Sequence, residues 1–264
     1  MRQILTRICA PDVRQQLISA QGLLRSLVIY HNPAAIRRWA RFYRGLLRPG
    51  DLAFDVGAHV GTRARAMRAA GAKVVALEPQ RPFSTFLART MPRDVTVLDM
   101  AVGRAAGEAD MAVSSRHPTV SSLASDFVEE APQATGFEHV RWDRRQAVRV
   151  TTLDALIARY GSPRYIKIDV EGHEEEVLGG LSAPVDIISV EYLPAYPALA
   201  LGLVERLRAM GNDAFNVVSG ETGRFLWEGW RDAEAARDWL SRQESSAPSG
   251  DLFARRGAPE APLR

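Results

Sequence analysis

Short apolar runs alternate with helix-forming stretches through the middle of the chain. The stretch Leu52–Gly61 follows a Pro49-Gly50-Asp51 turn and predicts a buried strand that leads into a glycine loop. The next residues, from Thr62 to Gly71, predict a helix that ends at glycine. Further strands are predicted at 73–79, 95–102, 164–172 and 185–191, with helices at 82–90, 152–161 and 174–180. This order predicts an α/β fold with a doubly wound, mostly parallel sheet.

The two ends of the chain have different patterns. Apolar residues recur at helical spacing over 12–29 and 34–47, and Asn32-Pro33 between them predicts a break and a helix cap. Near the other end, we predict a helix at 198–210 and an antiparallel strand pair at 214–218 and 252–254. The predicted organisation is an N-terminal helical extension at 1–49, an α/β domain at 50–256 and a flexible tail at 257–264.

The pattern loosens over residues 103–150. The many charged residues in its second half are typical of a surface excursion, although strand character returns at 148–151. Long insertions of this kind often carry specificity, so we expect contacts with a substrate here.

The charged residues are unevenly distributed along the chain, which the net charge of +3 does not reveal. Nine arginines precede Asp51, against a single acid, Asp12; they are Arg2, Arg7, Arg14, Arg25, Arg37, Arg38, Arg41, Arg44 and Arg48. A basic amphipathic arm can bind an anionic membrane or nucleic acid, but a helical cap with a solvated arginine face is commoner. The arm has no lysine and few aromatic residues, so we do not expect nucleic acid as a partner.

Composition also indicates the cellular compartment. The single cysteine, Cys9, leaves no internal disulfide and fits a reducing compartment. No apolar run approaches the roughly 20 residues that span a bilayer, and residues 1–11 lack the apolar block of a secretory signal. We therefore expect a cytoplasmic protein, with peripheral contact at the inner membrane face through the N-terminal arm left open.

The glycine loop and its acids point to a particular ligand. Gly57 and Gly61 do not match the usual dinucleotide-binding motif, and Asp55 precedes the first glycine by two residues. That carboxylate would disfavour a pyrophosphate, whereas S-adenosylmethionine carries a sulfonium and an amino group. Glu78 ends the second strand near the offset at which such folds place a carboxylate for ribose hydroxyls.

Several blocks of residues strengthen this interpretation. They are Phe54–Gly61, Leu77-Glu78-Pro79, Ala101-Val102-Gly103, Ile166–Glu174 and Val177–Gly180. Together they resemble the FkbM family of class I S-adenosylmethionine-dependent methyltransferases, with the Lys-Ile-Asp-Val-Glu-Gly block the most specific. The similarity extends from about Gly50 to Ala254 and includes Ser189–Tyr192 and Gly250–Phe253. The family usually has asparagine at position 59 and alanine at position 173, where this chain has histidines.

The resemblance implies a seven-stranded sheet of order 3-2-1-4-5-7-6. S-adenosylmethionine would lie over the first three strands and the acceptor over the fourth and fifth, leaving S-adenosylhomocysteine as product. Asp55, Gly57 and Gly61 would shape the methionine pocket, and Glu78 would hold the ribose. The implied cofactor-binding set also includes Asp99 and Met100 at the adenine, with Ala58, His59 and Pro79. We expect His59 to form a local hydrogen bond and assign it no catalysis.

A second cluster of acidic residues is expected to contact the acceptor. Asp169 and Glu171 alternate with Val170 on a predicted strand, so both side chains could point to one side, with Glu191 approaching from the next strand. Neighbouring carboxylates raise one another's pKa, which suits a general base. We predict that Asp169 or Glu171 deprotonates an acceptor hydroxyl with help from Glu191. Asp169-x-Glu171-x-His173 could also ligate a divalent metal, but we assign no metal site.

The sequence therefore predicts an S-adenosylmethionine-dependent O-methyltransferase acting on a sugar, glycan precursor or secondary metabolite. Methylation of nitrogen or of RNA is the alternative reaction. A non-catalytic module that binds the cofactor or docks on a membrane for a glycan-assembly complex is the alternative class.

Overall fold

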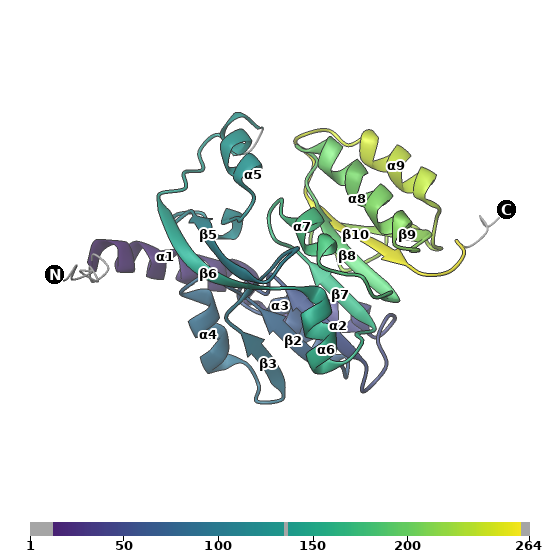
Figure 1. Ribbon diagram of the computed structural model, residues 1–264, viewed down its shortest axis with the longest axis horizontal. Coiled ribbons are helices and arrows are strands. Elements are labelled where there is room, and N and C mark those ends of the chain that lie inside the picture. The colour runs from purple at the N-terminus through teal and green to yellow at the C-terminus, as the bar shows by residue number, and fades with distance from the viewer. Residues whose placement is uncertain (1–12, 135–136, 260–264) are drawn as a thin grey trace, which may run out of the picture.

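A seven-stranded sheet forms the centre of the molecule (Figure 1). The computed structural model describes residues 13–134 and 137–259. The strands of the sheet are β1 (Leu52–Val56), β2 (Lys73–Leu77), β3 (Val95–Leu98), β7 (Tyr165–Ile168), β8 (Ile187–Tyr192), β9 (Ala214–Ser219) and β10 (Gly250–Arg255). They lie in the order β3-β2-β1-β7-β8-β10-β9, and β10 runs antiparallel to both neighbours. Counted within this sheet alone, the order is 3-2-1-4-5-7-6, as predicted.

Helices cover both faces of the sheet, which explains why its central strands are apolar throughout. Successive residues of β1 face opposite cores, with Phe54 and Val56 in one and Ala53 in the other. The first core includes residues of α6 (Leu153–Tyr160), α7 (Glu174–Gly179), α8 (Pro197–Ala209) and α9 (Ala233–Ser241). The second includes residues of α2 (Pro33–Tyr43), α3 (Thr62–Ala69) and α4 (Phe83–Thr90).

The third predicted strand is two strands in different sheets. The apolar run at 95–102 is interrupted at Asp99-Met100, so β3 ends at Leu98 and the chain crosses to a second sheet. There β4 (Ala101–Val102) pairs with β6 (Arg144–Thr151), which also pairs with β5 (Gly107–Val113). The prediction of one strand over 95–102 was therefore wrong.

The stretch 103–150 forms β5, β6 and α5 (Ser125–Glu130), and Met111, Val113 and Val148 form a small core of their own with Ala101. The charged part expected as a surface excursion, 129–149, is largely exposed or half-buried in its described residues, and its last residues belong to β6. The sequence predicts only the second half of β6, at 148–151; the first half was missed because Arg144 and Gln146 lie on the same face of the strand as Val148. Helix α9, capped by Asp232, was also missed.

The helix at α2 belongs to the core of the α/β domain. Asn32 accepts a hydrogen bond from the Ala34 backbone N–H at 2.8 Å, the cap that the sequence predicts. Trp39 and Tyr43 are fully buried, and the Trp39 Nε1–H donates to Glu221 Oε2 at 2.8 Å. This part of the predicted N-terminal extension therefore packs as an integral layer of the fold.

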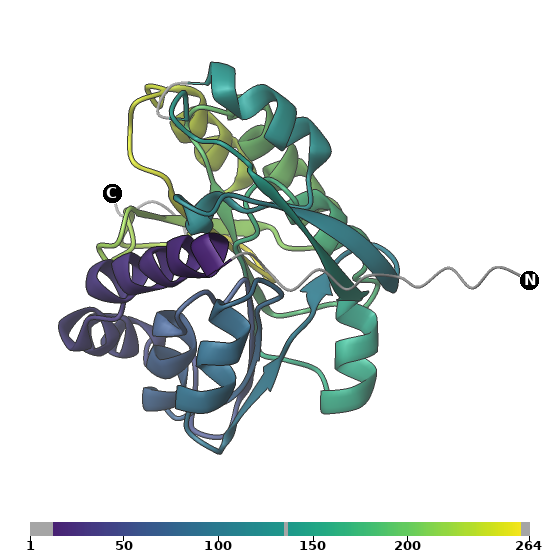
Figure 2. The ribbon, with the colours of Figure 1, turned by 90° about the vertical axis from the view of Figure 1, so that its left-hand side faces the viewer.

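The first helix, α1 (Val13–Tyr30), lies farther out, between α2–α4 and the second sheet (Figure 2). Leu24 and Val28 are 62% and 77% exposed, so this part of its apolar stripe does not pack. Within the described ranges, no helix combines the length and apolarity needed to cross a bilayer. Cys9 and the first two arginines lie outside the described residues.

Replacing Trp39 with alanine tests whether α2 is structural. We expect Trp39→Ala to lower the free energy of unfolding by about 3–5 kcal/mol, because a large, fully buried side chain is lost. Arg41→Ala, at an exposed position of the same helix, should change it by no more than about 0.5 kcal/mol. Urea unfolding measures both, and equal effects would mean that α2 does not support the core.

Candidate active site

A cavity of about 560 Å³ opens at the carboxyl ends of the parallel strands. Gly57 follows β1, Glu78 follows β2, and Asp169 follows β7, while Glu191 lies near the end of β8; all four line the cavity. This is the edge at which doubly wound sheets bind ligands. Helices α1 and α2 and the second sheet complete the wall.

Both glycines of the loop are required by packing within the protein. Gly57 has a φ of 81°, and a Cβ there would lie 1.8 Å from the Asp169 carbonyl oxygen. Gly61 has a φ of 78°, and its Cβ would lie 2.8 Å from side-chain atoms of Leu87 and Met91. Gly57 lines the cavity, but Gly61 does not, so the structure does not place Gly61 where the resemblance implies.

Asp55 lies behind the cavity wall. It is fully buried and is not among the lining residues. Burial raises the pKa of Asp55 to about 6, against the opposing charges of Lys167 and Arg63. Asp55 therefore influences the cavity through its charge and not through direct contact.

Glu78 connects the glycine loop to the segment that follows β2. Its carboxylate accepts the backbone N–H groups of His59 and Gln80, each at 2.8 Å. Burial raises the pKa of Glu78 to about 7 despite these two hydrogen bonds. Its side chain lines the cavity, as expected for a residue that would hold a ribose.

The other residues of the predicted cofactor set divide into two groups. Ala58, His59, Pro79 and Met100 line the cavity. Asp99 does not; its carboxylate lies 3.4 Å from the Arg81 guanidinium, on the surface. The sequence does not show which of Asp99 and Met100 enters the cavity. Adjacent side chains after a strand point in different directions, and the residues alone do not fix which direction faces the ligand.

His59 connects the loop to α1. Its Nε2 lies 3.1 Å from the Ser26 hydroxyl, and its ring lies 4.5 Å from that of Phe83. Burial lowers the pKa of His59 to about 4, so the imidazole is neutral near pH 7. His59 therefore forms a side-chain hydrogen bond, as expected, but with a residue 33 positions away in the chain and not with a local one.

Three carboxylates converge in the part of the cavity beside β7 and β8. Asp169, Glu171 and Glu191 each offer an oxygen within 4.8 Å of the others. All three line the cavity, as does His173, which is not part of this group of acids. The sequence therefore identified this cluster, Glu191 included; His173, considered only as a metal ligand with Asp169 and Glu171, is not among its members.

The reason given for this convergence was wrong. Strand β7 ends at Ile168, so Glu171 lies in a loop with a φ of 55° instead of on the strand. Residues other than glycine rarely adopt that conformation. Two contacts hold it: the Ser122 hydroxyl donates to the Glu171 carbonyl at 2.7 Å, and Glu174 accepts the backbone N–H groups of Val170 and Gly172.

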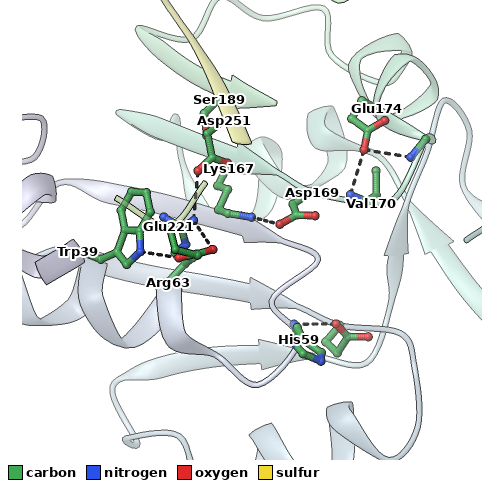
Figure 3. Close-up of polar contacts among 12 residues, drawn as sticks. Trp39, His59, Arg63, Lys167, Asp169, Val170, Glu174, Ser189, Glu221 and Asp251 are labelled. Atoms are coloured by element: carbon green, nitrogen blue, oxygen red, sulfur yellow. Dashed lines mark hydrogen bonds and ion pairs between the residues drawn. The ribbon is translucent and has the colours of Figure 1, made fainter. Parts of the chain in front are cut away.

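Lys167 is a site residue that the sequence did not predict. Its side chain is 2% exposed, and its Nζ lies 2.6 Å from Asp169 Oδ2 (Figure 3). A lysine two residues before an acid, in an otherwise apolar strand, was the available signal. A buried ammonium requires such a partner because an unpaired charge is costly away from water.

The lysine makes the three acids chemically unequal. Burial would raise the pKa of Asp169, but the Lys167 charge and hydrogen bond outweigh it and lower that pKa. The pKa values of Glu171 and Glu191 are raised well above their usual range by burial and by neighbouring carboxylates. Asp169 is therefore the ionised member, and the two glutamates are the groups that can exchange a proton.

A second network, of ion pairs, lines the cavity on the side of β10. The Arg63 guanidinium lies over the Trp39 ring, 3.1 Å from its centroid, and pairs with Glu221 at 3.0 Å and Asp251 at 3.2 Å (Figure 3). Asp251 is directly opposite Glu191 in the β8–β10 pairing. This network joins α2 and α3 to the far strands of the sheet.

Residues 55–246 match the family described as Methyltransferase FkbM domain. A search of curated proteins finds no match. The matched range contains the glycine loop, Glu78 and the three acids, but not Asp251.

Solved structures of methyltransferases are similar at low identity. A TehB-like SAM-dependent methyltransferase from Corynebacterium glutamicum has 9% identity and a TM-score of 0.46, covering 92% of this chain and 98% of that one. A putative O-methyltransferase from Klebsiella pneumoniae has 10% identity and a TM-score of 0.45, covering 95% and 93%. Likenesses this low carry no argument about function.

Glu174 allows a test of the buried charge at this site. It is 1% exposed, and burial raises its pKa from 4.5 to about 7. Between these values the native state binds more protons than the unfolded state, so stability falls as the pH rises. Glu174→Gln removes this titration and keeps a carbonyl acceptor for the two N–H groups.

We therefore expect the variant to become more stable relative to the wild type as the pH rises from 4.5 to 8. The relative gain should be about 3 kcal/mol, the free energy of the pKa shift. Urea unfolding across this range provides the measurement, with exposed Glu175→Gln as the control. Parallel profiles for wild type and Glu174→Gln would contradict the raised pKa.

Proposed function

The chain belongs to the FkbM family of S-adenosylmethionine-dependent methyltransferases. We propose that it transfers the methyl group to a hydroxyl group of its acceptor. The acceptor is a small molecule: a sugar, a glycan precursor or a secondary metabolite. The observation that carries the proposal is the group of three unequal carboxylates, Asp169, Glu171 and Glu191, at the mouth of the β7–β8 crevice.

The residues on the β1–β2 side fit the cofactor. Gly57, Glu78 and Met100 all line the cavity, and Gly57 presents backbone without a side chain there. We assign Gly57 to the methionine portion, Glu78 to the ribose and Met100 to the adenine. When bound, the cofactor supplies a methyl group on a sulfonium, already activated for displacement. The excess of acids around the cavity suits its positive charge.

The remaining task for the protein is to align the acceptor and remove its proton. Asp169, held ionised by Lys167, accepts a hydrogen bond from a second polar group of the acceptor and orients it. Glu171 or Glu191, in its carboxylate form, takes the single proton of the reacting hydroxyl and later releases that proton to water. The hydroxyl oxygen would gain the methyl group as the bond from methyl to the sulfonium sulfur breaks, which leaves S-adenosylhomocysteine. A carboxylate with a raised pKa is the better base for this step, which makes the glutamates preferable to Asp169.

A divalent cation is the alternative use of the same cluster. Three carboxylate oxygens within 4.8 Å of one another have the chemistry and spacing of a magnesium or manganese site. A bound cation would orient and acidify the acceptor hydroxyl in place of the glutamate base. The two uses predict different responses to chelation.

Substitution of the acids tests the proposal. With isotopically labelled S-adenosylmethionine and a panel of hydroxylated metabolites and nucleotide sugars, we expect methyl transfer detectable by mass spectrometry. Asp169→Asn, Glu171→Gln and Glu191→Gln should each reduce turnover about 10²–10⁴-fold, the usual contribution of a positioned base. Calorimetry should show that S-adenosylhomocysteine still binds. Glu176→Gln, in an exposed ion pair with Arg104, is the control.

Three outcomes would contradict parts of this proposal. Unchanged turnover in all three variants would exclude the carboxylates from catalysis. Loss of turnover with chelator, restored by magnesium or manganese, would replace the base by a metal. Failure of S-adenosylhomocysteine to bind the wild type would remove the methyltransferase function altogether.

A further inference from the structure

Arg38 points into the cavity from a helix whose other arginines face solvent. Ala35 and Arg38 of α2 both line the cavity, whereas Arg37 and Arg41 are exposed. The Nε atom of Arg38 is buried and has no hydrogen-bond partner. A desolvated guanidinium N–H without an acceptor is unfavourable, so a partner supplied by a ligand would stabilise this arrangement.

The other basic side chains of the cavity wall are already paired. Lys167 bonds to Asp169 at 2.6 Å, and Arg63 pairs with Glu221 and Asp251. Among lysines and arginines that line the cavity in the part of the chain the structure describes, Arg38 alone has no acid within 4.0 Å. An anion that enters the cavity therefore finds one uncommitted cation.

Arg38 lies on the acceptor side of the cavity. A Cβ on Gly223, in the loop after β9, would lie 3.2 Å from Arg38 Cγ, so the arginine stem packs against this loop. Its neighbour Trp39 bonds to Glu221 of the same loop. Strands β10 and β9 lie beyond β8, on the opposite side of β7 from β1 and β2. The proposed cofactor contacts, Gly57 and Glu78, follow β1 and β2.

We propose that Arg38 binds an anionic group of the acceptor, a carboxylate or a phosphate, and so selects an acidic substrate. This inference rests on the proposed function and specifies its substrate class. A guanidinium can hold such a group through two parallel N–H bonds, which fixes orientation as well as charge. It also offsets the repulsion that an anion would meet from Glu171, Glu191 and Glu221 in the same wall.

The cofactor's own carboxylate is the competing anion. Binding of S-adenosylhomocysteine and of 5′-methylthioadenosine, which lacks that carboxylate, separates the two sources. If Arg38 serves the acceptor, Arg38→Gln leaves both affinities within about twofold of the wild type. If it serves the cofactor, the variant loses affinity for S-adenosylhomocysteine only, and the proposal is overturned.

The acceptor is tested on protein saturated with S-adenosylhomocysteine. Glucose, glucuronic acid, glucose 1-phosphate and uridine diphosphate glucose are titrated into the wild type, Arg38→Gln and the exposed control Arg37→Gln by calorimetry. We expect at least one anionic member to bind wild type and Arg37→Gln about tenfold or more tighter than glucose. Arg38→Gln should bind that member no better than glucose, and Arg38→Lys should recover part of the preference.

Two results of the titrations would overturn the proposal. If no anionic member binds the wild type more tightly than glucose, or if Arg38→Gln keeps the preference, Arg38 does not select an acidic acceptor. Saturation with S-adenosylhomocysteine is the first stage of the experiment, so failure there refutes the proposed function, whereas failure only in the sugar titrations refutes this inference.

Discussion

The buried ion pair between Lys167 and Asp169 is the interaction on which the site depends. Lys167 is 2% exposed in the middle of the sheet, and burial alone would lower its pKa. Asp169, Asp251 and Asp55 outweigh burial and keep it charged. In return, the charge of Lys167 lessens the repulsion among the surrounding carboxylates of Asp55, Asp169, Glu191 and Asp251. The close contact of Gly57 with the Asp169 carbonyl, where a Cβ would lie 1.8 Å away, fixes the pair relative to the loop.

The N-terminal helices complete this site as well as the core. Helix α2 contributes Trp39, which lies under the Arg63 guanidinium and bonds to Glu221, and Arg38, which lines the cavity. Helix α1 reaches the glycine loop through the Ser26–His59 hydrogen bond. The strands thus present the acids at their carboxyl ends, and the helices close the space above them. A substrate that enters this space meets side chains from parts of the chain more than 180 residues apart, as in the Arg63–Asp251 pair.

Local chemistry explains which features could be predicted from the sequence. The order of strands, the Asn32 cap, the position of Glu78 and the grouping of the three acids follow from periodicity, turns and strand ends, or from a resemblance carried by contiguous motifs. Features set by distant residues could not be read. Gly61 looked like a ligand-contacting glycine, but its neighbours are Leu87 and Met91. The backbone of Glu171 is set by Ser122 and Glu174, and β6 is recognisable only beside β5. The predicted domain boundaries, cytoplasmic location and membrane contact stay predictions.

The most direct test of this account is a carbon-13 NMR titration of the side-chain carboxyl groups in the S-adenosylhomocysteine complex. Spectra of Asp169→Asn, Glu171→Gln and Glu191→Gln assign the three signals. The account predicts that Asp169 stays ionised below its usual pKa while a glutamate of the cluster titrates well above its own, and that Lys167→Met raises the pKa of Asp169. Ordinary titration of all three acids, or no change in Asp169 without the lysine, would contradict it.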